Sequence, residues 1–167
     1  MAAPTTVQLP VATRMLLASD GSTTVLLESL LGRRLAVRVS LQHRVGARQA
    51  PPRAVAALGL GPERTAVERH SALVTDQGEV VSRNVVVFTA SPRGWSVTAE
   101  DAVPLGNRLR DARILQHRQL LGRGTDRWSP DDEPCAYKEY LIRSEDGAHL
   151  YVHERFSPRY VPLPDAA

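Results

Sequence analysis

The chain has 167 residues and a formal charge of +3, with 43% hydrophobic and 23% charged residues, the composition of one globular domain with a sizeable core. No apolar run reaches the roughly 18 residues of a membrane-spanning helix, and residues 1–6 lack the pattern of a secretory signal. Cys135 is the only cysteine, which excludes an internal disulfide and a zinc site built from cysteine pairs. We expect a cytoplasmic protein with a single domain over 1–167, in which 1–10 and 158–167 are extended or frayed.

Arginine carries almost all of the positive charge, since Lys138 is the only lysine. The arginines are scattered along the chain, and only 5% of the residues are aromatic. Nucleic-acid surfaces usually gather basic side chains on one face, so we expect neither a nucleic-acid nor a membrane partner. The arginine excess reflects either the base composition of the genome or attraction for an anionic substrate.

The start of the chain predicts helices followed by a strand. Residues 11–18 are apolar in a pattern that fits a helix or a strand. Residues 23–31 have partial helical spacing after a polar break that supplies capping side chains, and Gly32 predicts their end. Alternation of apolar and polar side chains over 35–42 predicts a half-buried strand.

The middle of the chain predicts a loop and a hairpin. Residues 46–62 are rich in proline and glycine, which indicates either an ordinary surface loop or a flap over a cavity, with one short helix at 55–60. Residues 65–74 and 80–88 are β-rich, and the turn sequence at 75–78 predicts that they pair as a hairpin.

The last part of the chain predicts further strands. Residues 95–103 lead into a short helix that begins near Pro104 and ends near 111. We expect strands at 113–121, closed by Gly122, and at 135–143 and 149–156, with an exposed polar loop at 124–134. About six strands joined mostly by hairpins predict an α+β fold, an antiparallel sheet with helices packed to one side or end.

Two ionisable residues fall on the inward faces of predicted strands. A period of two places Glu154 beside Val152, and places Arg69 beside Val67. A carboxylate among apolar side chains is costly unless it is paired. The two residues are either a buried salt bridge that fixes strand register, or a ligand site in which Arg69 binds a carboxylate and Glu154 acts on a hydroxyl or ether oxygen.

Motifs for metals and cofactors are missing from the sequence. His149 and His153 share a strand face but have no further ligands at metal-binding spacing. The phosphate-binding loop, the dinucleotide fingerprint and the G-x-S-x-G nucleophile motif do not occur. We therefore expect no cofactor and no metal.

Across about residues 13–163, the chain resembles the chorismate lyase family, small enzymes that convert chorismate to 4-hydroxybenzoate and pyruvate. The order and spacing of four segments carry this resemblance: Ser19 to Glu28, Val67-Glu-Arg69 with Gly78-Glu79 and Ser82-Arg83, Pro104-Leu-Gly106, and Leu150 to Tyr160. The resemblance implies a six-stranded antiparallel sheet with helices or flaps that close an internal ligand pocket, and a chorismate-like carboxylate as substrate. We expect a monomer or weak homodimer.

The resemblance also implies roles for individual residues. Arg69 and Glu154 would be catalytic, with Arg69 on the ring carboxylate and Glu154 facing the oxygen at C4. The expected substrate-binding residues, besides Arg69, are Leu105, Gly106, Ser22, Thr23 and Ser82.

Other functions fit the same pattern. Ser22, Ser82, His70 and His153 depart from the bacterial ubiquinone-pathway enzyme, so the pocket would also suit another substrate. One alternative is a different elimination or cyclisation in natural-product biosynthesis. Another is a non-catalytic effector-binding (UTRA) sensor, which has the same fold and would need a partner chain, because no winged-helix domain fits before residue 13.

Overall fold

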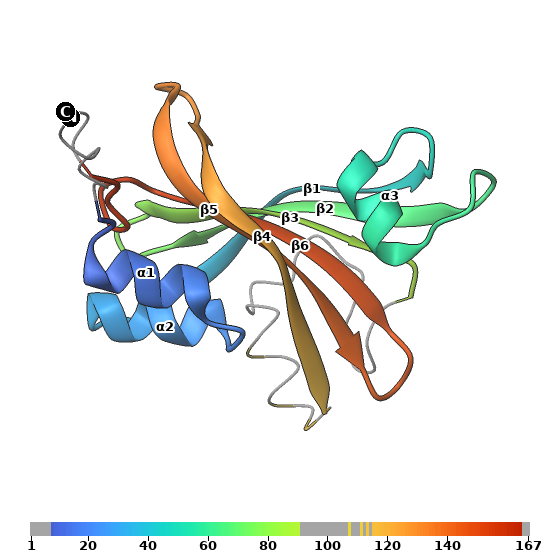
Figure 1. The fold of residues 1–167 in the computed structure, drawn as a ribbon, viewed down its shortest axis with the longest axis horizontal. Helices are drawn as coiled ribbons and strands as arrows, with labels where there is room; N and C mark the ends of the chain where they lie inside the picture. The colour runs from blue at the N-terminus through green and yellow to red at the C-terminus, as the bar shows by residue number, and fades with distance from the viewer. Residues whose placement is uncertain (1–7, 91–106, 108–110, 112, 114, 165–167) are drawn as a thin grey trace, which may run out of the picture.

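The computed structural model describes residues 8–90, 107, 111, 113 and 115–164 (Figure 1). Within residues 8–90 and 115–164 the chain forms three helices and one six-stranded antiparallel sheet, which confirms the predicted α+β fold. No helix in these ranges is long and apolar enough to cross a membrane. The elements in chain order are α1 (Val11–Ala18), α2 (Thr23–Leu31), β1 (Ala36–Gly46), α3 (Pro52–Leu58), β2 (Thr65–Val74), β3 (Val80–Phe88), β4 (Gln116–Trp128), β5 (Glu133–Ser144) and β6 (His149–Phe156).

The sheet consists of two three-stranded meanders joined at their centre. Strands β1, β2 and β3 pair in chain order, as do β4, β5 and β6, and β3 pairs with β6 to give the order β1-β2-β3-β6-β5-β4. The last strand therefore lies in the middle of the sheet. The two predicted site residues, on β2 and β6, are brought to either side of β3.

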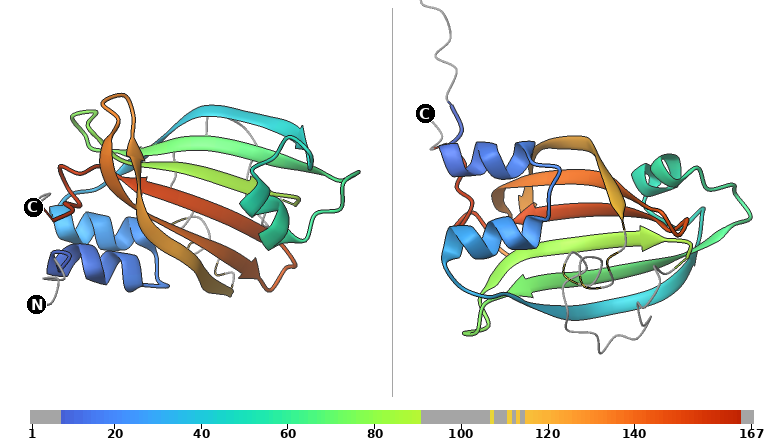
Figure 2. Two further views of the ribbon diagram at one scale, coloured as in Figure 1. Left: turned by 45° about the horizontal axis from the view of Figure 1, so that its top comes forward. Right: turned by 90° about the horizontal axis from the view of Figure 1, so that it is seen from below.

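Helices cover the two faces of the sheet at opposite ends (Figures 1 and 2). On one face, α1 and α2 pack on a core that includes Leu27, Leu73 and Phe156. On the other face, α3 packs on a core that includes Leu141 and Tyr151. Strand β6 is thus buried on both faces, which explains its weak alternation of apolar and polar residues.

Local capping agrees with the predicted helix ends. The Ser22 hydroxyl accepts a hydrogen bond from the Val25 amide at 3.5 Å, at the start of α2. Gly32 ends this helix with a φ of 64°, a left-handed conformation that favours glycine. The ambiguous segment 11–18 forms α1, because helical spacing lets Leu16 and Leu17 pack together into the core.

The predicted end of the fourth strand was wrong. The structure continues β4 through Gly122 to Trp128, so most of the expected loop at 124–134 belongs to a long β4–β5 hairpin. The pairing shifts register between Leu120 and Gly122, where a Cβ atom would lie 2.7 Å from Glu139 Oε1. Gly122 lets the Glu139 side chain lie close to the backbone of β4, and it does not end the strand.

Two other segments are more ordered than their composition indicated. Strand β1 reaches Gly46, and the short helix starts at Pro52, three residues before its predicted start. After β6, Val161 is only 1% exposed, and the Tyr160 hydroxyl donates to Glu79 Oε2 at 2.6 Å. The chain therefore stays packed against the domain beyond the last strand.

Candidate functional site

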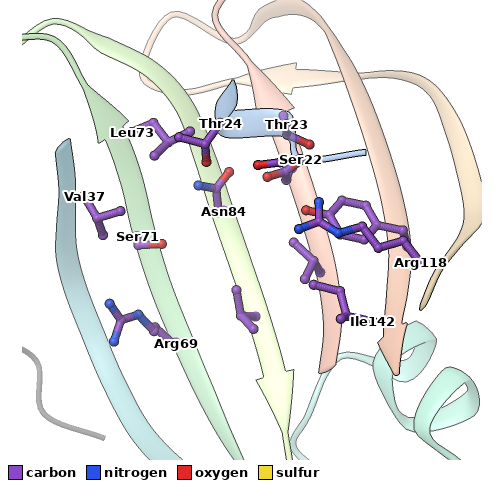
Figure 3. Close-up of a pocket in the computed structure, with 14 residues that line it drawn as sticks. Ser22, Thr23, Thr24, Val37, Arg69, Ser71, Leu73, Asn84, Arg118 and Ile142 are labelled. Carbon is purple, nitrogen blue, oxygen red and sulfur yellow. The ribbon is translucent and has the colours of Figure 1, made fainter. Parts of the chain in front are cut away.

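A hollow of about 50 Å³ lies on the helix α1–α2 side of the sheet (Figure 3). Its lining comes from the first turn of α2 and from all six strands. The joining of the two meanders through β3 and β6 therefore creates this site, because each meander alone supplies only part of the wall.

Arg69 and Glu154 both line this hollow, as predicted. They are 4% and 5% exposed, and β3 lies between their strands, so two spacings of roughly 4.8 Å separate them across the sheet. Arg69 Nη1 donates to Gln42 Oε1 at 3.0 Å. Glu154 Oε2 has no hydrogen-bond partner among the described residues, and no ion pair joins Glu154 to Arg69 there. The alternative of a buried salt bridge between the two does not describe this arrangement.

The other predicted binding residues have different locations. Ser22 and Thr23 line the hollow at the start of α2. Ser82 is fully buried on the same sheet face, but its register partners are Leu73 and Phe156, which places it under the helices and outside the lining. Leu105 and Gly106 lie outside the described residues, and their roles stay predictions.

Sequence reasoning missed Asn84, Tyr140 and Arg118, which also line the hollow. Period-two counting from Ser82 would have placed Asn84 on the inward face. Arg118, on β4, donates to the Gly21 carbonyl at 2.7 Å and lies 5.6 Å from the centre of the Tyr140 ring. Figure 3 shows it at the opposite side of the hollow from Arg69. It carried no sequence signal, because β4 is an edge strand with polar residues along its length.

The electrostatic surroundings of the hollow favour an anion. Arg69 and Arg118 line it, and Lys138, 1% exposed, lies opposite Glu154 on the neighbouring strand. Burial lowers the pKa of Lys138, and the Glu154 carboxylate acts in the other direction. Burial, and next the charge of Glu154, raise the pKa of Tyr140, so its phenol stays neutral, and it lies close to the side chains of Thr23 and Glu154. Among the described residues, the lining itself contains two arginines and one carboxylate, and the charges of Glu154 and Asp20 both act on Lys138 beside it.

Three buried polar atoms with no hydrogen-bond partner in the described structure belong to residues that line the hollow. They are Thr23 Oγ1, Asn84 Oδ1 and Glu154 Oε2. Buried polar groups are nearly always hydrogen-bonded, to protein, water or ligand. Because these atoms come from α2, β3 and β6, their convergence is a property of the tertiary structure. A molecule bound in the hollow would supply the missing partners.

The described residues include no group of three or more histidine, cysteine, aspartate or glutamate side chains placed to hold a metal ion. The hollow itself offers one carboxylate, hydroxyls, an amide and guanidinium groups. This set can bind an anion and hydrogen-bond to hydroxyl groups.

Comparison with known proteins finds similarity at the level of structure. No family model and no curated protein sequence matches the chain. Among solved structures, PhnF from Mycobacterium smegmatis aligns with a TM-score of 0.63 at 14% identity, over 86% of this chain and 67% of PhnF. The separate effector domain of PhnF aligns with a TM-score of 0.61 at 14% identity, over 84% of this chain and 91% of that domain.

A GntR-family transcriptional regulator from Enterococcus faecalis aligns with a TM-score of 0.53 at 13% identity, over 74% of this chain and 94% of the regulator structure. At such identities the similarity shows the fold alone. The resemblance to the chorismate lyase family stays a prediction. This chain has the UTRA-like fold of the effector domains of transcriptional regulators.

Proposed function

We propose that this domain is a ligand-binding domain of the UTRA type and that its ligand is a small hydroxylated anion. The convergence of Thr23 Oγ1, Asn84 Oδ1 and Glu154 Oε2 on one hollow lined by Arg69 and Arg118 carries this proposal. Among the described residues, unpartnered buried polar atoms also occur outside the hollow, for example at Ser82 and Ser144, so it is the clustering of three of them beside Arg69 and Arg118 that supports a ligand site.

The lining specifies two kinds of chemical group on the ligand. Guanidinium groups bind carboxylate or phosphate with charge-assisted hydrogen bonds, and the start of helix α2 adds a favourable field for negative charge. Asn84 Oδ1 and Glu154 Oε2 are acceptors and need donors, which ligand hydroxyls supply. A hydroxy acid or a sugar phosphate has both kinds of group.

The volume of the hollow sets a condition on binding. It measures about 50 Å³, whereas pockets for drug-sized ligands usually measure roughly 300–1,000 Å³. A ring-sized ligand must therefore widen the hollow as it enters. Association should be slower than the usual range of about 10⁵–10⁷ M⁻¹s⁻¹, because it requires a conformational change.

Calorimetry with a small panel of compounds tests the proposal. The panel is glucose 6-phosphate, 4-hydroxybenzoate and chorismate, with uncharged glucose as the control. We expect at least one anion to bind and glucose not to bind. Arg69→Gln should weaken binding by about 10–100-fold, the effect of a lost charge-assisted hydrogen bond of roughly 1.5–3 kcal/mol.

Arg83→Gln is the matched control for Arg69→Gln. Arg83 lies on β3 next to β2 but points to the opposite face, where its guanidinium lies 5.2 Å from the centre of the Trp128 ring. This variant should bind like the parent protein. Equal losses in both variants, or no binding by any anion of the panel, would contradict the proposal.

A second candidate function is elimination of pyruvate from chorismate. The observation in its favour is a buried Glu154 carboxylate with an unpartnered oxygen on a hollow that Arg69 also lines. Such a pair can orient a carboxylate substrate and assist proton movement. Mass spectrometry of chorismate incubated with the protein separates the two functions: recovery of intact chorismate supports a binding domain, and pyruvate with 4-hydroxybenzoate supports a lyase. In the second case Glu154→Gln should abolish turnover and retain binding.

A further inference from the structure

Lys138 is the only lysine in the sequence, and it lies in the interior of β5 with 1% of its surface exposed. An ammonium group is expensive to bury unless its donors are satisfied. The presence of a lysine at this position therefore calls for a specific set of partners.

The partners of Lys138 are carbonyl groups at the end of helix α1. Its Nζ atom donates to the Leu16 carbonyl at 3.1 Å and to the Ser19 carbonyl at 3.2 Å. The last carbonyls of a helix have no intrahelical donors and attract a positive charge. Lys138 thereby fixes the corner between α1 and α2 (residues 19–21) to the sheet.

This corner leads directly into the ligand hollow. Ser22, Thr23 and Thr24 follow it at the start of α2 and line the hollow. The position of these three residues depends on how the corner is held, because only the turn at Ser19 to Gly21 separates them from α1. An anchor on the Ser19 carbonyl acts three residues from Ser22.

Glu154 would be the ordinary partner for Lys138 and is not used as one. The two residues lie directly opposite each other on β5 and β6. No ion pair joins them in the described structure, and Glu154 Oε2 has no hydrogen-bond partner there. By turning to the α1 carbonyls, Lys138 leaves Glu154 Oε2 available to a ligand, while the Glu154 charge still raises the pKa of Lys138 against the effect of burial.

We propose that Lys138 is a positioning residue of the ligand site: its ammonium group anchors the α1–α2 corner, so that the first turn of α2 and the Glu154 carboxylate both face the ligand. This inference rests on the proposed anion-binding function. It adds a residue that does not line the hollow and that acts on the ligand through Ser22, Thr23 and Thr24.

The test uses inorganic phosphate, an oxyanion small enough to need little widening of the hollow, titrated by amide chemical shifts in NMR spectra. Lys138→Met should weaken phosphate binding at least tenfold. Arg123→Met is the matched control, because Arg123 also donates to a carbonyl at the end of α1, that of Leu17 at 3.5 Å, but from the surface and outside the hollow. It should leave phosphate binding unchanged.

A double-mutant cycle separates positioning from a general loss of stability. Thr23→Val should weaken phosphate binding about fivefold in the parent protein and less than twofold in the Lys138→Met background, because the anchor that presents Thr23 is already lost. Equal effects of Thr23→Val in both backgrounds would overturn the proposal.

Hydrogen exchange tests the anchor without any ligand. The Ser19 amide donates to the Met15 carbonyl, and the Leu26 amide donates to the Ser22 carbonyl, on either side of the corner. In Lys138→Met, exchange at these two amides should accelerate at least tenfold more than in the β2–β3 ladder. A uniform change would overturn the proposal. If the parent protein binds no phosphate and no panel anion, the proposed function fails while this measurement still decides the role of Lys138.

Lys138→Met leaves Glu154 without its neighbouring cation and is the variant at risk of unfolding. The double variant Lys138→Met/Glu154→Gln removes the charges of both residues, and it replaces Lys138→Met in the exchange experiment if that variant unfolds. Its corner amides should also exchange at least tenfold faster, relative to the ladder, than those of Glu154→Gln alone. Equal exchange in these two proteins would contradict the anchoring role.

Discussion

Two buried glutamates on opposite faces of the sheet differ in how their carboxylates are satisfied. Glu139 and Glu154 lie on the paired strands β5 and β6, and each is 5% exposed. Glu139 points toward the α3 side, and Glu154 points toward the hollow. Because the residue type and the exposed fraction are the same, the comparison shows how hydrogen-bond partners alone determine the role of a buried carboxylate.

Glu139 is fully occupied by the protein itself. Arg53, on α3, donates to Oε1, and the Tyr151 hydroxyl donates to Oε2 at 2.7 Å. This carboxylate joins a helix to the sheet. Glu154, in contrast, keeps Oε2 without a partner in the described residues, although Lys138 lies on the neighbouring strand. A buried glutamate is therefore structural or available to a ligand according to what surrounds it in space.

Isosteric substitution of the two glutamates should give opposite results, and this is the largest stability effect that we expect. Glu139→Gln replaces two charge-assisted hydrogen bonds by neutral ones, and it should lower the free energy of unfolding by about 1–3 kcal/mol. Glu154→Gln removes an incompletely satisfied buried charge, and its free energy of unfolding should stay within about 0.5 kcal/mol of the parent value or rise. Urea denaturation measures both.

The comparison also predicts which variant loses ligand. Glu154→Gln should weaken binding of the anion found in the calorimetric panel, whereas Glu139→Gln should not change its affinity. A destabilised Glu154→Gln protein with unchanged affinity would mean that Glu154 has a structural role like that of Glu139.

A smaller loss of stability should follow when a new side-chain atom is placed against Glu139. In Gly122→Ala the new Cβ atom would meet Glu139 Oε1 at 2.7 Å and Cγ at 3.3 Å, which must displace a carboxylate held at both oxygens. We expect a loss of roughly 1–2 kcal/mol in the free energy of unfolding. Gly46→Ala is the control, because a Cβ atom there meets only Gln49 at 3.9 Å. Equal losses in both variants would show that replacing any glycine within a strand lowers the free energy of unfolding by this amount, without a contribution from Glu139.

The smallest expected effect is a change in how stability depends on pH, and it arises from His153, which lies opposite Glu139 on β6. Burial lowers the pKa of His153 below its ordinary value, while Glu139 and Asp126 oppose this shift. The folded protein then binds fewer protons than the unfolded chain just below pH 6.5, so the contribution of His153 to stability is present above pH 6.5 and is lost as the pH falls through the folded pKa.

His153→Gln should therefore have a flatter stability profile between pH 7 and pH 5 than the parent protein. Thermal unfolding at several pH values measures this difference. A steeper decline toward pH 5 in the variant would mean that the Asp126 and Glu139 carboxylates dominate and raise the pKa of His153.

Period-two counting was sufficient to place Arg69 and Glu154 on inward strand faces, because side-chain direction along a strand is a local property. Capping residues likewise placed the ends of α2 at Ser22 and Gly32. The same local signals misplaced the end of β4, where glycine and proline indicated a loop but pairing with β5 extends the strand. Non-local hydrogen bonds outweigh local propensity in sheets.

The sequence by itself determined an α+β domain with six strands and two charged residues that point inward. Only the tertiary structure decided that β6 lies beside β3, that Lys138 binds the end of α1, and that Glu139 has partners while Glu154 Oε2 has none in the described residues. The physical reason is that the direction of a side chain depends on its own strand, whereas its hydrogen-bond partners come from elements that are distant in the chain and meet only when the two meanders join.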